Sequence, residues 1–288
     1  METTGAADGN LADALRQYAA AAFSGVVRVD GQPGGTIYLS GGRISACETS
    51  GAPSLEVILL RSRTISESDW DAAFTAAAVG KRPLTAELIE RGLIGAGALE
   101  AMLRIALADA VFAVVSGRVD GWAEAPAADC LLPLTPAARS GWLLAEATRR
   151  GQALAAFPPP ALSAQDRVTA APGARPGRGQ DTLLALADGR RTPRDLAFAL
   201  GRGLYETMLE LGRMRAEHLV VTSPSGKDPS PPGDPGDALP DGEDDDRTVT
   251  GLPRRRKDRP ASPRGTEASR RNLTSIRMLR LRSEGNSA

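Results

Sequence analysis

The chain has 288 residues, with 35 basic and 35 acidic side chains and therefore no formal net charge, and only 4% of its residues are aromatic. This length predicts two folded domains, and the abundance of alanine and leucine predicts a core of small aliphatic side chains. There is no run of about 18 apolar residues, so no membrane span is expected. The opening METTGAADGN has neither a basic nor an apolar region, so we expect no secretory signal and a cytoplasmic location.

A short helix and a run of strands are expected first. Asn10 is placed to cap a helix over 11–22, and residues 23–48 alternate β-branched runs with glycine-containing pairs. Asp30–Gly31 and Gly41–Gly42 predict tight turns, because glycine adopts positive φ angles without a Cβ clash. The pattern predicts a three-stranded antiparallel meander.

The outward face of this meander is the first candidate binding surface. Alternation along the strands turns the polar or amphipathic side chains of Arg28, Tyr38 and Arg43 outward, and we expect them to contact a partner. The glycines of GQPGG and SGGR also suggest a phosphate loop, but they lack the GK[ST] ending and a following helix. Hairpin turns explain them better.

Helical patterns follow the meander. Ser66 with Asp69 three residues later is a helix-start signal, and Ile65 and Trp70 are spaced as a hydrophobic staple. A glycine-rich or proline-rich break ends each later segment. The expected elements are helices over 55–61, from Ser66, from Thr85 and over 98–115, strand structure within 118–134, and a helix over 136–157.

A second small unit is expected after a linker over 158–179. Thr192 is a helix cap with Pro193 in the first helical position and Asp195 at the third. The sequence predicts helices over 181–187, from Thr192 and over 204–216, and then a strand over 218–222. Three helices followed by a strand is the order of a winged-helix domain.

The remainder, 223–288, is expected to be disordered because it lacks apolar periodicity. Its first part, 223–246, has eight acidic residues and one lysine, whereas 247–282 has twelve basic and two acidic residues. The basic cluster Arg254–Lys257 and the segment 273–281 have three interpretations: solvated chain, contact with nucleic acid or anionic lipid, and a short motif that folds onto a partner. The acidic stretch 241–246 is also able to fold back on the basic part.

The expected fold class is therefore α+β. A small antiparallel sheet with a helical insertion is followed by a small winged-helix-like domain and a disordered C-terminal tail. The expected divisions are 10–157 for the sheet domain, 158–179 for the linker, 180–222 for the winged-helix-like domain and 223–288 for the tail.

The order of segments in residues 11–135 resembles the PATAN family, a domain family of unknown function. The resemblance is carried by FSGVVRV, GTIYLSGGRISAC, LTAELIERGLIGAGALEAML and AVFAVVSGRVDGWAEAP. It implies a signalling and protein-interaction module of the kind found in bacterial response regulators, often encoded near roadblock-type proteins and small GTPases. It implies no catalytic residue. A small GTPase, a roadblock-type protein or a response regulator is the partner class it suggests.

Catalytic and metal sites find little support in the residues. His218 is the single histidine and is expected at the start of a strand, away from any nucleophile. Cys47 and Cys130 are far apart and fit no metal-ligand spacing, so we expect buried free thiols. We therefore expect no enzyme activity, no cofactor and no metal.

DNA binding is the alternative function, because the third helix of a winged helix often reads the major groove. The exposed positions of the expected third helix include Glu206, Glu210 and Arg213, with Glu217 just beyond. An acidic face opposes binding to phosphates. The candidate nucleic-acid contacts are Arg190, Arg191, Arg194, Arg202, Arg254, Arg255, Arg256 and Lys257. The sequence favours a non-enzymatic bacterial signalling adaptor that binds a protein, with a DNA-binding transcriptional regulator as the alternative.

Overall fold

The computed structural model describes residues 4–5, 10–177 and 179–224, with side chains from residue 10 onward. All of them belong to one compact unit of the chain. The protein is mixed α+β with an antiparallel sheet, which confirms the expected fold class for this part of the chain. Apart from its first two residues, the tail predicted to be disordered lies outside the described residues.

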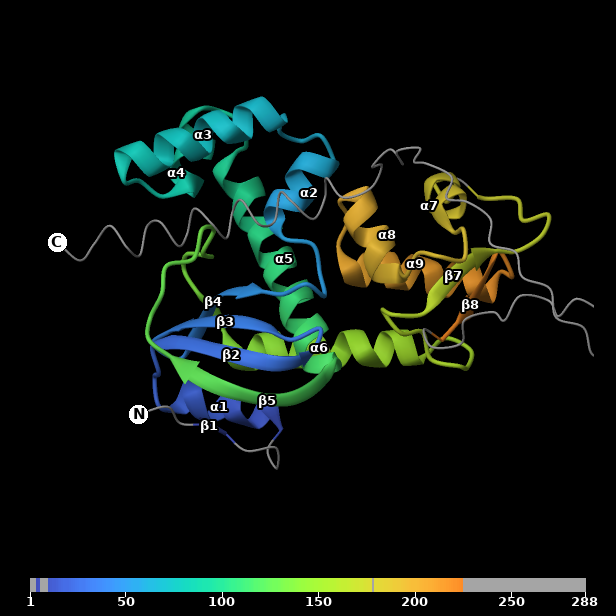
Figure 1. Ribbon diagram of the computed structural model, residues 1–288, viewed down its shortest axis with the longest axis horizontal. Coiled ribbons are helices and arrows are strands. Elements are labelled where there is room, and N and C mark those ends of the chain that lie inside the picture. Colours follow the sequence, from blue (N-terminus) through green and yellow to red (C-terminus); the bar gives the residue numbers. More distant parts are fainter. Residues whose placement is uncertain (1–3, 6–9, 178, 225–288) are drawn as a thin grey trace, which may run out of the picture. The chain divides into compact units, whose positions relative to one another are not determined.

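Six strands form the main sheet. They are β1 (Thr4–Gly5), β2 (Gly25–Gln32), β3 (Gly35–Ser40), β4 (Arg43–Glu48), β5 (Arg118–Ala125) and β6 (Ala138–Arg139). Their order is β1-β5-β2-β3-β4-β6, and every neighbouring pair is antiparallel (Figure 1). The predicted meander is confirmed as the centre of this sheet. The strand predicted within 118–134 is β5, which pairs with β2 from far along the chain.

The first turn of the meander is not where the sequence predicts it. β2 continues through Asp30 and Gly31, and the chain reverses at Pro33–Gly34. Gly31 lies at a bulge where β2 pairs with β5, with φ 151°, and a Cβ there would be 2.0 Å from the carbonyl oxygen of Arg118. The predicted turn at Asp30–Gly31 was wrong because this glycine serves the close approach of β5.

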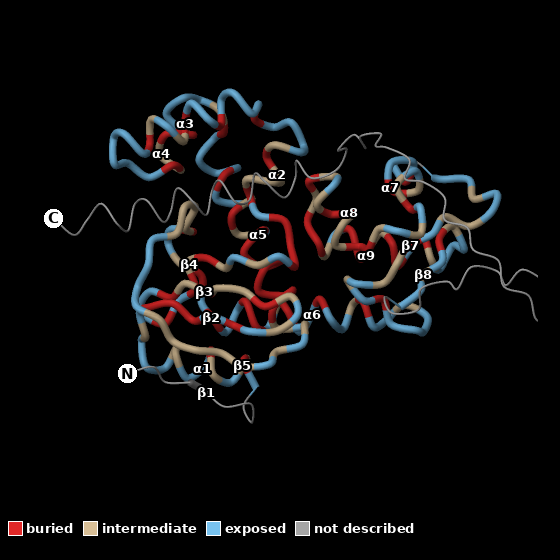
Figure 2. Tube along the Cα trace, in the orientation of Figure 1, coloured by how far each residue is buried: buried red, intermediate tan, exposed pale blue. Residues whose placement is uncertain are grey.

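Helices cover one face of the sheet. They are α1 (Leu11–Ala20), α5 (Ala96–Ser116) and α6 (Ser140–Ala155), and their buried side chains form one core with Val27, Ile37 and Ile44 of the sheet (Figures 1 and 2). Val27 and Ile37 are fully buried, whereas their neighbour Arg28 is exposed. This period-two alternation leaves Arg28 and Tyr38 on the opposite face.

A helical insertion lies between β4 and α5. It comprises α2 (Leu55–Arg61), α3 (Glu67–Gly80) and α4 (Leu84–Glu90). The Ser66 hydroxyl accepts the backbone N–H of Asp69 at 3.1 Å and donates to its carboxylate at 2.6 Å, so the predicted start signal is confirmed. Ile65 and Trp70, on either side of this cap, are both buried.

The last helix of the sheet domain begins later than predicted. The sequence predicts a helix from Pro136, but α6 begins at Ser140, and Ala138–Arg139 form the edge strand β6. Arg139 is paired with Arg43 and Ala138 with Ile44 of β4. A helix over these residues would leave this edge of β4 without the partner that it has in the fold. The apolar periodicity within residues 136–157 contains no information about this pairing with β4, which is distant in the sequence.

The C-terminal unit contains the helices that the sequence predicts and a strand that it does not. It comprises β7 (Arg167–Ala170), α7 (Asp181–Leu186), α8 (Pro193–Leu200), α9 (Leu204–Ala216) and β8 (Val220–Ser223). Thr192 and Asp195 form the capping box of α8, which confirms the predicted cap, and α9 has the predicted bounds. β7 lies in the range assigned to a linker and pairs with β8 through four residue pairs.

The core of the C-terminal unit extends into the sheet domain. Phe112 of α5 and Leu154 of α6 belong to the same buried cluster as Leu196 and Leu211 of α8 and α9. A unit of this size is near the lower limit for an independent hydrophobic core. It therefore relies on α5 and α6, the same helices that support the sheet.

Candidate functional site

The three predicted contact residues of the meander lie on the outward face of the sheet. Arg28 is paired with Thr36, and Tyr38 is two residues further along β3, so these two side chains are diagonal neighbours. Ser40 is paired with Arg43, and a bulge between Tyr38 and Leu39 keeps Arg43 on the face of Tyr38. The structure thus brings the three residues to one face, with Arg43 nearest to the β6 edge.

Tyr38 is held in place by an acid. Its hydroxyl donates to Oε2 of Glu48 at 3.0 Å. Burial and the Glu48 carboxylate both raise the pKa of Tyr38 above its usual value, whereas nearby Arg28 lowers it. The phenol therefore stays protonated at neutral pH, and its proton is used in the hydrogen bond to Glu48. Arg28 and Arg43 make no ion pair within the described residues, so they are the freer cations of this face.

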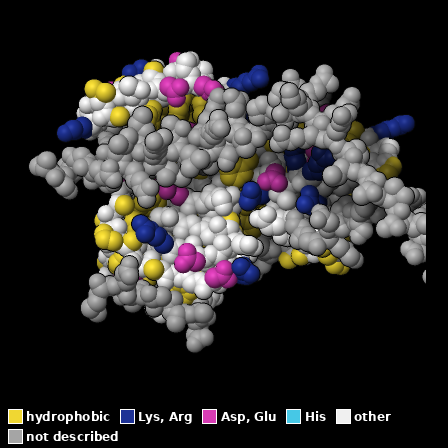
Figure 3. All heavy atoms as spheres, viewed as in Figure 1, with side chains coloured by type: hydrophobic (Ala, Val, Ile, Leu, Met, Phe, Trp, Pro, Cys, Tyr) yellow, Lys and Arg dark blue, Asp and Glu magenta, His cyan; other side chains and the backbone are white. Residues whose placement is uncertain are grey.

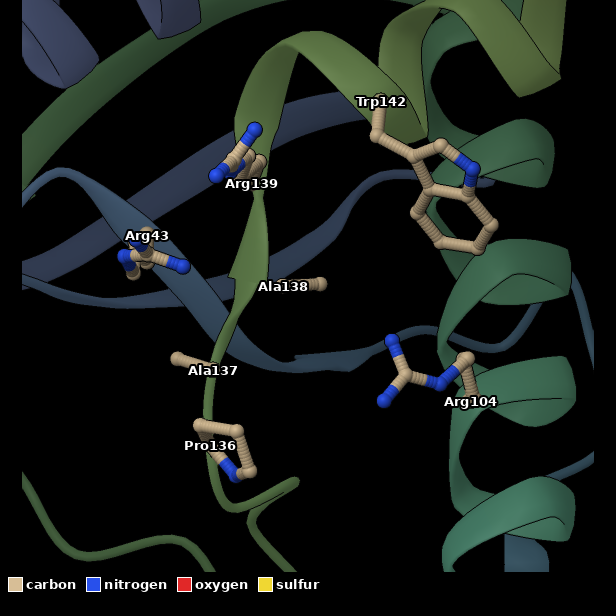
Figure 4. A pocket seen from close by; sticks show the side chains of 7 residues that line it. All are labelled: Arg43, Arg104, Pro136, Ala137, Ala138, Arg139 and Trp142. Carbon is tan, nitrogen blue, oxygen red and sulfur yellow. The ribbon is translucent and has the colours of Figure 1, made fainter.

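Arg43 also lines a hollow at the sheet edge, which we call the arginine groove. Its volume is about 320 Å³. In Figure 4 the strand segment Pro136–Arg139 forms part of its wall and lies between Arg43 and Arg139 on one side and Arg104 and Trp142 on the other. The lining residues are Arg43, Arg104, Pro136, Ala137, Ala138, Arg139 and Trp142.

The charge of the arginine groove is positive and largely uncompensated. None of its lining residues is acidic. Arg104 bonds Glu100 at 2.7 Å, whereas Arg43 and Arg139 form no ion pair with any described residue. α6 begins beside the groove without a side-chain cap or an acidic residue in its first turn, so its positive end adds to the same field. An anionic group is the ligand that this field attracts.

Trp142 gives the groove an apolar contact. Its side chain is 44% exposed although it lies in the first turn of a well-packed helix. The buried stripe of α6 contains Leu143, Leu144, Ala147 and Leu154, and Trp142 falls outside it. Tryptophan and arginine together are the residues most enriched at the centres of protein interfaces.

Sequence reasoning found one residue of the groove and missed the others. Arg43 was predicted from strand alternation. Arg139 and Trp142 fell within the predicted helix 136–157 and Arg104 within the predicted helix 98–115, and none of them was singled out. Trp142 did offer one signal, because an aromatic side chain outside the apolar stripe of an amphipathic helix is exposed without helping to form the core.

The predicted nucleic-acid contacts of the C-terminal unit are partly neutralised. Arg191 is 2.8 Å from the Asp188 carboxylate, and Arg194 is 3.5 Å from that of Asp195. Arg190 and Arg202 form no ion pair within the described part of the chain. Figure 3 shows basic and acidic side chains interspersed over the region of α8. Arg254, Arg255, Arg256 and Lys257 lie outside the described residues.

The helix that a winged helix would place on DNA carries both acidic and basic side chains on its outer surface. Glu206 and Arg213 are exposed on α9, Arg215 is partly exposed there, and Glu217 is exposed just after the helix. Glu210 is half-buried, bonded to Arg213 at 3.3 Å and to Gln180 at 3.2 Å. Gly212 on its other side lies against the Phe157 ring, where a Cβ would come within 2.6 Å. α9 is therefore packed on one side and presents interspersed acidic and basic side chains on the other.

The two cysteines, which are far apart in the sequence, lie near the same carboxylate: the Cys130 thiol is 3.9 Å from Oε1 of Glu48, and Cys47 is the residue before Glu48. No cluster of three or more His, Cys, Asp or Glu side chains in the described residues has metal-binding geometry. His218 is exposed at a turn with φ 59°. In the same part of the chain, no helix is long and apolar enough to cross a bilayer.

Comparison with protein-family models, with curated proteins and with solved structures gave no match. The arrangement of the residues themselves is therefore the basis for a functional proposal.

Proposed function

We propose that this protein is a non-enzymatic regulatory adaptor that binds another protein through its sheet domain, with the arginine groove at the centre of the contact. The observation that carries the proposal is the combination of two uncompensated arginines, Arg43 and Arg139, with the exposed indole of Trp142. Such a surface recognises an extended acidic segment that also offers an apolar side chain. The arginines steer and orient the partner, and the indole contributes apolar contact area.

The resemblance of residues 11–135 to the PATAN family supports the same class of function. It suggests bacterial signalling as the setting and a small GTPase, a roadblock-type protein or a response regulator as the partner. Arg28 lies on the same face of the sheet and extends the proposed contact beyond the groove.

A capture experiment with the full-length chain tests the proposal. The native protein and an Arg43→Glu/Arg139→Glu variant are used to capture partners, and the affinity of each captured protein is then measured with purified components. The control is Arg63→Glu/Lys81→Glu, which makes the same charge change at two exposed cations of the helical insertion. A partner that binds the native and control proteins but loses about tenfold or more with the groove variant supports the proposal, since several charge pairs are reversed. Equal binding to all three proteins contradicts it.

DNA binding remains the second candidate, favoured by the Arg254–Lys257 cluster and by the unpaired Arg190 and Arg202. It predicts a mobility shift of random duplex DNA at low salt that is lost in an Arg190→Glu/Arg191→Glu/Arg194→Glu variant. The acidic side chains interspersed on α9 and the ion pairs of Arg191 and Arg194 argue for the adaptor. A shift that depends on those three arginines would reverse this ranking.

A further inference from the structure

We infer that the anionic group bound by the arginine groove is a phosphoryl group, carried on a phosphorylated serine or threonine of the partner protein. This inference rests on the proposed function, because it names the chemistry that the same site recognises.

Two arginines of the groove are directly opposite each other in the sheet. Arg43 of β4 is paired with Arg139 of β6, and Figure 4 shows both side chains on the same side of β6. The Cβ atoms of such a pair lie about 4.5–5.5 Å apart, and like charges at this spacing repel each other. Neither guanidinium group has a hydrogen bond or an ion pair with a residue that the structure describes. An anion that bonds both groups at once therefore offsets their repulsion.

A phosphoryl group suits this pair better than a carboxylate does. A guanidinium group binds an anion through two parallel N–H donors, and a carboxylate has only two oxygens and one negative charge. One carboxylate therefore satisfies one of the two arginines. A phosphorylated side chain has three terminal oxygens and a charge of about −1.5 to −2 at neutral pH, so it accepts hydrogen bonds from both.

The kind of cation in the groove supports the same ligand. The basic residues of the lining are all arginines, namely Arg43, Arg104 and Arg139. Arginine presents its donors in a rigid planar fork that matches the oxygens of a phosphoryl group, whereas lysine acts as a point charge. Arg104 lies on the other side of β6 and is bonded to Glu100 at 2.7 Å, so we assign the phosphoryl group to the other two.

The remaining lining favours a peptide over a nucleotide. A site that recognises a base fixes its orientation with a few precisely placed polar groups. The lining residues other than arginine are Pro136, Ala137, Ala138 and Trp142, and none of their side chains accepts a hydrogen bond. These residues offer apolar contacts, which suit the side chains of a peptide.

The position of Trp142 predicts where the apolar residue of the peptide stands. Arg43 and Arg139 lie on one side of β6, and the indole lies on the other (Figure 4). In an extended segment, successive side chains point in opposite directions. A segment at this edge therefore places its phosphorylated residue beside the arginines and an adjacent apolar residue beside the indole, which is 44% exposed.

The test compares three synthetic peptides that differ at one position. The first has phosphoserine between two leucines, and the others have glutamate or unmodified serine in its place. Each is titrated into the nitrogen-15-labelled full-length chain at constant ionic strength, and the indole N–H signal of Trp142, identified with Trp142→Phe, reports binding. We expect the phosphopeptide to bind about tenfold or more tightly than the glutamate peptide, since it adds one to three charge-assisted hydrogen bonds.

Two variants locate the binding site. Arg43→Gln/Arg139→Gln is expected to lose about tenfold or more in affinity for the phosphopeptide. The control Arg63→Gln/Lys81→Gln removes two exposed cations of the helical insertion and should keep the native affinity. Both groove arginines are exposed, and far-ultraviolet circular dichroism checks that the fold persists.

Adenosine monophosphate distinguishes the source of the phosphoryl group. It carries the same group on a nucleoside, and we expect it to bind more weakly than the phosphopeptide because the lining has no side chain that accepts hydrogen bonds from a base. Tighter binding of adenosine monophosphate would overturn the assignment to a phosphorylated protein and indicate a nucleotide site.

Three other results would also overturn the inference. Equal affinity for the phosphoserine and glutamate peptides, lost in the groove variant, means that the groove binds acidic segments without preference for phosphate, and the proposed adaptor function survives. Phosphopeptide binding that persists in the groove variant places the site elsewhere. Binding of none of the peptides rejects phosphoryl recognition, while the capture experiment decides the adaptor function separately.

Discussion

Arg150 of α6 bonds the carboxylate of Asp109 of α5 inside the protein, where their side chains are 8% and 3% exposed. The guanidinium also bonds Glu146 at 2.9 Å and lies 4.8 Å from the centroid of the Tyr205 ring on α9. Gly203, the residue before α9, lies so close to Asp109 that a Cβ there would be 2.6 Å from Oδ2 of Asp109. This pair joins the sheet domain to the C-terminal unit at one point.

Removing one member of the pair is expected to destabilise the fold strongly. Asp109→Ala leaves the buried Arg150 charge with Glu146 as its remaining acidic partner and should lower the free energy of unfolding by about 3 kcal/mol, the low end for a broken buried pair. Urea denaturation measures this change. Glu100→Ala, which breaks the exposed pair with Arg104, is the control and should cost no more than about 1 kcal/mol. In the double variant Asp109→Ala/Arg150→Met, part of the loss should be recovered. Equal losses for the buried and exposed pairs would contradict this role.

Glu146 should make stability depend on acidic pH. Hydrogen bonds from Arg149 and Arg150 lower its pKa to about 2 from an ordinary value of 4.5. Because the folded-state pKa is depressed, its contribution is present above about pH 4.5 and is lost as pH falls towards about 2. Glu146→Gln should flatten the stability profile in this window, measured by urea denaturation at successive pH values. Glu206→Gln, at an exposed position of α9, should keep the native slope. An unchanged slope in Glu146→Gln would show that the two arginines do not depress this pKa.

The second turn of the meander should tolerate alanine at one glycine and not at the next. Gly41 and Gly42 both have positive φ, 56° and 75°, so alanine at either costs about 1 kcal/mol. A Cβ at Gly41 meets nothing within 4 Å, whereas at Gly42 it would be 2.6 Å from the carbonyl oxygen of Ala19. Gly42→Ala should therefore cost about 2–4 kcal/mol. Thermal unfolding compares the two variants, and equal losses would rule out the α1 contact as the cause.

The thiol of Cys130 should react slowly. Burial raises its pKa to about 12, and burial with the nearby Glu48 charge raises that of Cys47 as well. Since the thiolate is the nucleophile, alkylation by iodoacetamide at pH 8 should be on the order of a thousandfold slower than in the urea-unfolded chain. Mass spectrometry of quenched samples follows both residues. Alkylation of Cys130 at the unfolded rate would show that the thiol is not protected.

Much of the local structure was predictable because its causes lie within a few residues. The caps at Ser66 and Thr192 bond backbone groups three residues away, and Gly41–Gly42 adopts left-handed angles that few other residues tolerate. The bounds of α2 and α9 follow from short apolar patterns between such signals. Each of these features was correctly predicted without knowledge of the rest of the fold.

The predictions failed where a residue depends on a distant strand. Gly31 serves the approach of β5, β6 forms because β4 offers an unpaired edge, and β7 is ordered by β8 more than 50 residues later (220 − 167 = 53). The hydrogen bonds of these strand pairs form between segments that are distant in the sequence. No residue pattern within one segment therefore predicts the pairing.

The candidate site divides in the same way. The sequence by itself determined the meander, its outward alternation and hence Arg43, together with the charges that the chain carries. Only the tertiary structure decided that Arg43 is joined by Arg139, Arg104 and Trp142, since these come from two strands and two helices. The physical reason is that a groove is a property of how elements pack against one another, and packing brings together side chains that the sequence separates by up to 99 positions (142 − 43 = 99).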